Sequence, residues 1–266
     1  MNKKVGLPLL LLVVLMFSCT KVPVSGRRQM HLLPESMLIN MGASSYRQIL
    51  QQTPPSSASN VNSMMVKNMG QKMSQAVAKY LKSKKQSSRI EGFKWEFNLV
   101  NSKDVNAFCL PGGKVIINEG ILAVTQTEAA LAVVMGHEIA HAIARHGNER
   151  MSQGLLVATG GLALQIALSQ NPSETNNLFL QSYGLGTQMG ILKYSRTHES
   201  EADKIGLIFC AMAGYNPQEA IGFWERMSKI GGAKPPQILS THPSDETRIK
   251  DLKAFMPKAL KYYKPS

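Results

Sequence analysis

Two stretches near the start of the chain repeat apolar side chains at helical spacing. They cover residues 35–50 and 61–82, and a segment with two prolines, 53–57, separates them. Because such spacing gives a helix one face to bury, the pattern predicts two amphipathic helices. Residues 93–100 and part of 114–118 instead alternate between apolar and polar positions. This alternation predicts strands of a small antiparallel sheet, with a type II turn at Pro111-Gly112.

A third stretch with apolar residues at helical spacing, before and around His137, also contains two histidines and a glutamate. Leu131, Val134 and Met135 recur at that spacing and lead into His137. The residues at 125–128, Thr-Gln-Thr-Glu, form the pattern of a capping box, so the helix is expected to begin about three turns before His137. Two imidazoles and a carboxylate on the apolar side of a helix are costly to bury without a metal or hydrogen-bond partners.

The five residues His137-Glu138-Ile139-Ala140-His141 have the spacing of a zinc site on a helix. Side chains four positions apart share one face, so both imidazoles can reach one tetrahedral ion. Glu138 then lies beside the attacking water, where it can act as a general base. The motif therefore predicts a zinc peptidase with one Zn²⁺ per chain, His137 and His141 as metal ligands and Glu138 as the catalytic residue.

A catalytic zinc ion needs a third protein ligand, and the helical segment after residue 198 offers one. Glu199 and Asp203 lie four positions apart on one face, which small residues continue at Gly206 and Cys210. A helix with such a face can pack closely on another helix. We predict Glu199 as the third ligand and Asp203 as the acceptor that orients a zinc-binding imidazole. The helical phase turns Glu201 to the opposite side, where it is expected to be solvated.

Two further histidines are weaker alternatives as ligands. His198 lies outside the small-residue face. His146 follows His137 by nine positions, which is about half a turn out of phase at 3.6 residues per turn. We interpret His146 as a polar residue near the end of its helix.

The motifs occur in the order found in one family of peptidases. They are HExxH, the ExxxD pair that begins at Glu199, a strand and turn at 106–113, Ser195-Arg196, and Thr241-His242-Pro243. Over residues 35–255 this combination resembles the gluzincin metallopeptidases of the HtpX and CAAX-prenyl-protease family. Within that family it is most similar to the small periplasmic lipoproteins related to BepA and LoiP. The helical-repeat domain of BepA is not expected in this chain. The resemblance implies an α+β, mainly α fold: a gluzincin-type metallopeptidase domain with an HExxH helix and a small antiparallel sheet. It also implies that His242 lies near the zinc, as a possible regulatory residue or fourth ligand.

The first residues have the shape of a secretory signal peptide. Lys3 and Lys4 precede an apolar run at 6–17, which is too short to span a bilayer comfortably. Residues 16–19 resemble a bacterial lipobox, so we predict a signal peptide at 1–18, lipidation of Cys19, a tether at 19–34 and a metallopeptidase domain at 35–266. Simple secretion and an uncleaved anchor are the alternatives. Thr20 is not the aspartate that commonly retains lipoproteins in the inner membrane, which favours the outer membrane.

The chain is strongly basic, with a net charge of +13. The positive charges gather at 79–89 and 253–264 without interleaved aromatic residues or zinc-finger spacing, so nucleic acid is not expected as a partner. Anionic lipid headgroups or acidic segments of client proteins suit this charge better. Cys109 and Cys210 could form a disulfide or be two small core residues.

These observations predict a zinc-dependent endopeptidase on the periplasmic side of the bacterial cell envelope, lipid-anchored at Cys19. The resemblance implies misfolded or unassembled periplasmic and outer-membrane proteins as substrates. The alternative is a latent protease that acts mainly as a client-binding, chaperone-like factor, because a fourth ligand at His242 would displace water from the metal.

Overall fold

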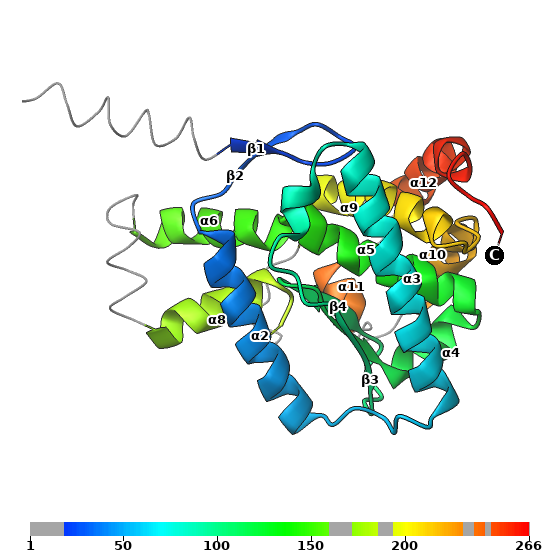
Figure 1. Cartoon of the computed structure of the whole chain (residues 1–266), viewed down its shortest axis with the longest axis horizontal. Coiled ribbons are helices and arrows are strands. Elements are labelled where there is room, and N and C mark those ends of the chain that lie inside the picture. The colour runs from blue at the N-terminus through cyan, green and yellow to red at the C-terminus, as the bar shows by residue number, and fades with distance from the viewer. Residues whose placement is uncertain (1–18, 160–171, 186–193, 231–236, 243–245, 266) are drawn as a thin grey trace, which may run out of the picture.

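The computed structural model describes residues 19–159, 172–185, 194–230, 237–242 and 246–265 (Figure 1). The signal peptide predicted at 1–18 lies outside these residues. Two strands, β1 (Cys19–Lys21) and β2 (Arg28–Met30), precede the helices α2 (Glu35–Gln52) and α3 (Val61–Ser83) and a 3-10 turn at Ser87–Ile90. The strands β3 (Glu96–Val100), β4 (Ala107–Leu110) and β5 (Lys114–Asn118) follow. A 3-10 turn at Glu119–Ile121 then leads into a series of helices: α4 (Leu122–Thr125), α5 (Glu128–Ala144), α6 (His146–Thr159), α8 (Pro172–Ser182), α9 (Arg196–Met212), α10 (Glu219–Lys229), α11 (Gln237–Thr241) and α12 (Glu246–Leu260).

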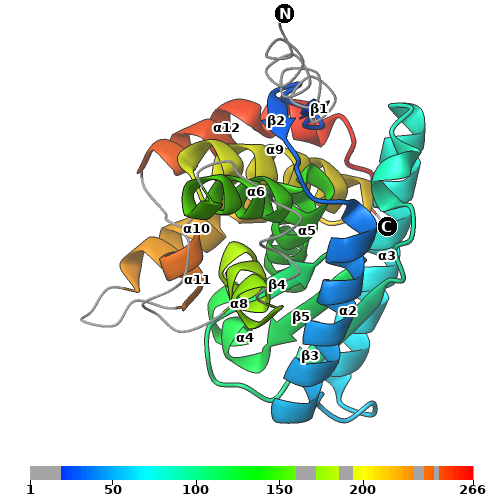
Figure 2. The ribbon, with the colours of Figure 1, turned by 90° about the vertical axis from the view of Figure 1, so that its left-hand side faces the viewer.

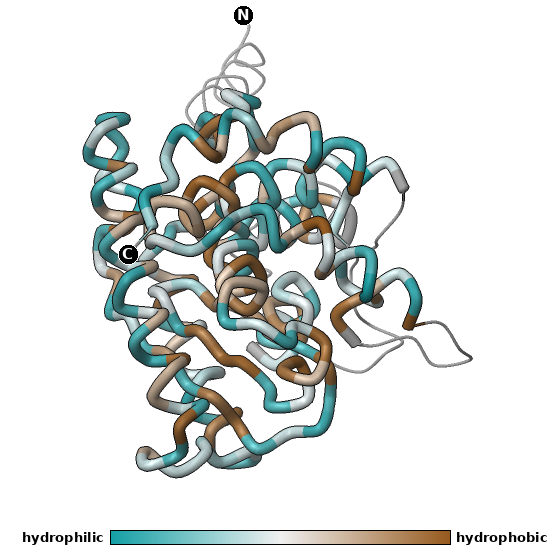
Figure 3. The backbone as a smooth tube through the Cα atoms, turned by 90° about the vertical axis from the view of Figure 1, so that its right-hand side faces the viewer, coloured by the Kyte–Doolittle hydropathy of each residue, from teal (hydrophilic) through white to brown (hydrophobic). Residues whose placement is uncertain are grey.

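The helices form layers on the sheet. In Figure 2, α12, α9 and α5 lie in succession above the strands, and α2 and α3 flank them. Hydrophobic stretches gather in the middle of the fold, whereas hydrophilic positions recur along the outer helices (Figure 3). The mainly helical fold with a small sheet agrees with the architecture expected from the sequence. None of the helices in the described part of the chain has the length and hydropathy needed to cross a bilayer.

The three-stranded sheet has the order β3-β5-β4. β4 and β5 pair antiparallel across a turn in which Gly112 and Gly113 have φ values of +83° and +78°. β3 pairs parallel to β5, with Phe97 opposite Val115, so this sheet is mixed and not wholly antiparallel. An alternating pattern identifies a strand but not its direction, and here the connection after β3 carries the chain to the far side of β5. Among the described residues, the second edge of β4 pairs with no strand.

The segment 19–34, expected to be a tether, contains a structural element of the domain. β1 and β2 pair as an antiparallel hairpin. Val22 in its loop is only 1% exposed and belongs to the main hydrophobic cluster. The hairpin therefore packs onto the helices.

The helix that carries HExxH begins at Glu128, because Thr127 caps it by accepting a hydrogen bond from the amide of Ala130. Thr125 of the expected capping box lies in α4, and Gln126 separates the two helices with φ at +63°. The helix thus begins close to the expected position, but Thr127 caps it and Thr125 does not.

Candidate metal centre

α5 and α9 touch through their backbones. A Cβ atom added to Gly136 would lie 2.8 Å from the carbonyl oxygen of Gly206, and one added to Gly206 would lie 2.8 Å from the amide nitrogen of His137. Only glycine allows this approach. The small-residue face predicted around Gly206 is therefore confirmed as a helix-packing face. It brings Glu199 of α9 over the two histidines of α5.

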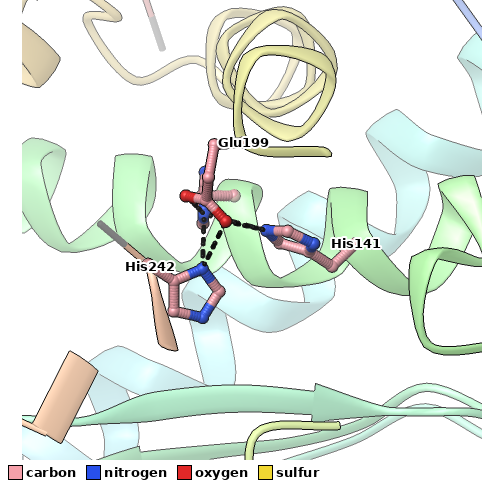
Figure 4. Close-up of side chains that lie close together, drawn as sticks. His141, Glu199 and His242 are labelled. Atoms are coloured by element: carbon pink, nitrogen blue, oxygen red, sulfur yellow. Dashed lines mark hydrogen bonds and ion pairs between the residues drawn. The ribbon is translucent and has the colours of Figure 1, made fainter. Parts of the chain in front are cut away.

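Four side chains converge at this contact, and Figure 4 labels three of them, His141, Glu199 and His242. One ligand atom from each of His137, His141, Glu199 and His242 lies within 4.8 Å of all the others, and every one of these residues is buried. The Nε2 atoms of His137 and His141 are 3.1 Å apart, and Nε2 of His141 lies 3.3 Å from Oε1 of Glu199. His242, which follows α11, places Nδ1 3.0 Å from the same carboxylate oxygen. The ring of Tyr194 lies against His141, with 4.0 Å between the ring centres.

The carboxylate of Asp203 and the guanidinium of Arg248 contact the imidazole of His137 at its Nδ1 atom. Oδ1 of Asp203 lies 2.9 Å from Nδ1 of His137, as predicted for an orienting acceptor, and leaves Nε2 facing the cluster. Arg248 of α12 donates to both oxygens of Asp203 at 2.8 Å and places Nη1 2.8 Å from Oε2 of Glu199. The indole of Trp224 lies 3.4 Å from the Arg248 guanidinium carbon. No local pattern marks Arg248 as part of the site, since a basic residue on an amphipathic helix normally faces solvent.

The carboxylates of the cluster differ in their proton affinity. Burial raises the pKa of Glu138, because a charge is disfavoured away from water. Burial acts on Glu199 in the same direction, but the charges of His242 and Arg248 outweigh it and hold the pKa of Glu199 well below its usual value. The pKa of Asp203 is lowered in the same way by Arg248 and His137. The site therefore combines two ionised carboxylates with one carboxyl group that holds a proton more readily.

These residues fit a zinc ion. Three imidazoles and a carboxylate are the nitrogen and oxygen donors that zinc binds at tetrahedral sites. Oε1 of Glu138 is buried without a hydrogen-bond partner among the described residues, and Nε2 of His242 is 3.6 Å away. The ionised carboxylates outnumber the one guanidinium beside them, so a bound cation would offset the excess of buried negative charge.

Glu201 is buried, not solvated as its helical phase suggested. It accepts hydrogen bonds from Ser25 and Arg27 of the N-terminal hairpin, and its Oε2 lies 3.0 Å from Nε2 of His146. The physical reason is that the N-terminal hairpin covers part of α9 in addition to the helices α5, α12 and α3 that pack against it. The phase of a single helix cannot show the second partner.

The two histidines considered as alternative ligands, His146 and His198, lie outside the metal cluster, but neither is a simple surface residue. α5 ends at Ala144, Arg145 adopts a left-handed φ of +61°, and the chain turns so that Nδ1 of His146 lies 3.0 Å from Nδ1 of His141. His146 is wholly buried, which corrects its interpretation as a polar residue at a helix end. His198 places Nε2 3.1 Å from Glu149 of α6 and points away from the cluster.

The Cys109 and Cys210 thiols are both free and buried. A disulfide between them is therefore wrong, and the alternative of two small core residues holds.

Comparison with known proteins identifies the family. Residues 67–256 match peptidase family M48. The chain is 33% identical over 261 residues to the mitochondrial metalloendopeptidase OMA1 of Saccharomyces cerevisiae, across 92% of this chain and 71% of the yeast protein. It is 39% identical over 181 residues to OMA1 of Arabidopsis thaliana, across 67% of this chain and 35% of that protein.

A bacterial relative is similar over a shorter region. The chain is 31% identical over 163 residues to the beta-barrel assembly-enhancing protease of Escherichia coli, across 59% of this chain and 33% of that protein. The chain thus spans about a third of the length of the Arabidopsis and E. coli relatives. The family match covers well over half of the chain and includes the cluster built on α5 and α9, so the chain belongs to peptidase family M48 and is a metalloendopeptidase.

Proposed function

We propose that this metalloendopeptidase uses zinc and acts in the bacterial cell envelope on misfolded or unassembled proteins. The observation that carries the proposal is the convergence of His137, His141 and Glu199 beside the buried carboxyl group of Glu138. In this proposal the first three residues hold the ion and Asp203 orients His137. The ion supplies Lewis-acid chemistry, which lowers the pKa of a water and polarises the peptide carbonyl.

The environment of Glu138 suits a general base. Its pKa is raised by burial, and a base works best when its pKa approaches the working pH. Glu138 accepts a proton from the attacking water and delivers it to the leaving amine. Oε1 of this residue makes no hydrogen bond among the described residues, and Nε2 of His242 is 3.6 Å away, so no hydrogen bond has to break before Oε1 takes up this proton.

The substrate binds as an added strand in this proposal. The unpaired edge of β4 offers backbone donors and acceptors to an extended peptide, and such pairing selects shape over sequence. β4 is close to the site, because it packs against α5, the helix that carries HExxH. Unfolded segments can extend along such an edge, whereas folded domains cannot.

The location rests on the sequence and on one relative. The lipobox-like residues before Cys19 support a lipid anchor on the periplasmic side, in the outer membrane. The E. coli relative is named for enhancing β-barrel assembly, which supports a bacterial envelope setting. The OMA1 relatives are mitochondrial, so the same catalytic domain also serves another compartment. The similarity to known proteins therefore supports the protease activity more directly than the location in the bacterial envelope.

Glu138→Gln tests the mechanism. Because Glu138 is assigned to proton transfer and not to metal binding, the variant should keep about one zinc per chain and lose roughly 10²–10⁴-fold in turnover of an unfolded protein. Zinc content by elemental analysis and cleavage of a reduced, unfolded substrate measure the two effects. Full activity in this variant would end the proposal.

A latent protease is the second candidate, and the position of His242 favours it. Its Nδ1 lies 3.2 Å from Nε2 of His137 and 3.0 Å from Glu199, so its ring can fill a fourth ligand position and keep water from the metal. In that case His242→Ala should raise basal cleavage. A large loss of activity would make His242 a catalytic residue instead, and an unchanged rate with unchanged zinc affinity would exclude both roles.

A further inference from the structure

A continuous chain of polar contacts joins the N-terminal hairpin to the metal cluster. We propose that Arg27, in the hairpin loop, is a positioning residue for the metal ligand His141 and acts through Glu201 and His146. This inference rests on the proposed role of His141 as a zinc ligand. It makes a segment more than a hundred residues before HExxH in the sequence a part of the active-site scaffold.

The contacts between the rings determine where each proton lies. Nδ1 of His141 and Nδ1 of His146 are 3.0 Å apart, so one of these atoms must donate and the other accept. An imidazole nitrogen that binds a metal carries no proton, which leaves the proton of His141 on Nδ1. His146 therefore accepts at Nδ1 and keeps its own proton on Nε2. That atom lies 3.0 Å from Oε2 of Glu201 and donates to it.

Arg27 holds the carboxylate at the end of this chain. Its Nε and Nη2 atoms donate to the two oxygens of Glu201, each at 3.0 Å, and Ser25 donates to the same group. Arg27 also makes two hydrogen bonds of 2.7 Å to Glu149 on α6, which in turn accepts from His198. One guanidinium thus bridges α6 and α9 and fixes the rotamer of Glu201.

A second arginine fastens the hairpin to the turn of α5 that follows His141. The buried guanidinium of Arg89 donates to the carbonyl oxygen of Lys21 in β1 and, at 2.7 Å, to that of Ile143 in α5. The side-chain amide of Gln29 in β2 lies 3.4 Å from the carbonyl oxygen of Arg145, where α5 gives way to α6. A shift of the hairpin would therefore displace both the side chain of Glu201 and the backbone of α5 beside His141.

Loss of Arg27 should weaken metal binding more than folding. Removing an outer partner of a zinc-binding histidine typically costs 10–100-fold in metal affinity. Arg27 reaches His141 only through Glu201 and His146, so we expect a smaller effect: zinc should leave Arg27→Gln up to about 10 times faster than the wild type when the full chain is challenged with a chelator. Arg28→Gln is the matched control, because Arg28 is exposed on the same hairpin and makes no ion pair among the described residues. It should lose zinc at the wild-type rate.

The visible spectrum of the cobalt-substituted protein provides a readout that a general loss of stability would not move. Arg27→Gln should change the cobalt absorption bands, because the ring of His141 is no longer fixed, while circular dichroism stays that of a folded chain. Arg27→Lys should give an intermediate rate of zinc loss, since one ammonium group cannot bridge two carboxylates as a planar guanidinium does. If Arg27→Gln does not fold, Ser25→Ala removes a single hydrogen bond to Glu201 and should accelerate zinc loss to a smaller extent.

The outcomes separate this inference from the proposed function. A wild-type chain that binds no zinc, or an active Glu138→Gln variant, would defeat the proposed function. A zinc-binding wild type whose Arg27→Gln or Ser25→Ala variant folds and keeps the wild-type rate of zinc loss and cobalt spectrum would defeat only the role of Arg27. Faster zinc loss in Arg28→Gln, equal to that in Arg27→Gln, would also overturn it, because the effect would then come from the charge of the hairpin and not from the contacts.

Discussion

Gly206→Ala tests whether the contact between α5 and α9 sets the geometry of the metal site. The added Cβ would lie 2.8 Å from the amide nitrogen of His137 and 2.9 Å from the carbonyl carbon of Gly136. Both are backbone atoms within a helix, so neither can rotate away. To restore an ordinary contact of about 3.5 Å, the helices must separate by roughly 0.7 Å. Glu199 would then move away from His141 by a similar amount.

The expected loss of function is larger than the loss of stability. Overpacking of this kind costs about 1–3 kcal/mol, and replacing a helical glycine by alanine returns about 1 kcal/mol, so stability should fall by roughly 0–2 kcal/mol. A misplacement approaching 1 Å at a catalytic site can cost on the order of 10²-fold in rate. Denaturant unfolding, zinc content and kcat/KM on an unfolded protein measure the three quantities separately.

Gly222→Ala in α10 is the matched control. Its added Cβ would meet only Nη1 of Arg226, at 3.3 Å, and that atom is the end of a flexible side chain. The control should be equally or more stable than the wild type and keep both zinc and activity. If Gly206→Ala behaves like this control, the backbone contact does not determine the ligand geometry.

Three further predictions concern other parts of the chain. Glu199→Ala should lose the metal, whereas Asp203→Ala should bind it about 10–100-fold more weakly in a zinc titration, and equal affinity to the wild type would contradict the orienting role. Cys19→Ala should leave an unlipidated precursor, so labelling with a fatty-acid analogue should disappear; equal labelling would refute the anchor. Burial raises the pKa values of Glu149 and Glu201, but Arg27, with His198 or His146, outweighs it and lowers both to about 2 from 4.5. Their stabilisation is therefore present above pH 4.5 and is lost as the pH falls towards 2, and urea unfolding of the wild type and Arg27→Gln should converge over that range.

The sequence predicted the helices that carry HExxH and ExxxD, because both patterns depend on neighbours within one helix. The two helices that begin the domain end within two residues of their expected bounds, at Gln52 and Ser83. The packing face at Gly206 was also found from the sequence, since small residues at helical spacing have a direct steric meaning. The parallel pairing of β3 was not found, because direction depends on a connection that carries no pattern.

The surroundings of the metal cluster could not be predicted for a related reason. Arg248 and Arg27 reach the site from segments whose own patterns describe only an amphipathic helix and a short hairpin. The return of His146 to His141 depends on the left-handed conformation of Arg145, which glycine normally signals and arginine does not. Contacts between distant segments that satisfy buried charges leave little trace in the local sequence.

The unpaired edge of β4 gives the proposed substrate choice a thermodynamic basis. A strand inside a folded client already has its hydrogen-bond partners, so it must first open locally before it can pair with this edge. When opening is fast and reversible, the cleavage rate follows the population of the open form, and each 1.4 kcal/mol of local client stability slows cleavage about tenfold. The cleavage rate of such an enzyme would report how stably a client protein has folded. Two clients with the same cleavage site would be cut at different rates because their local stabilities differ.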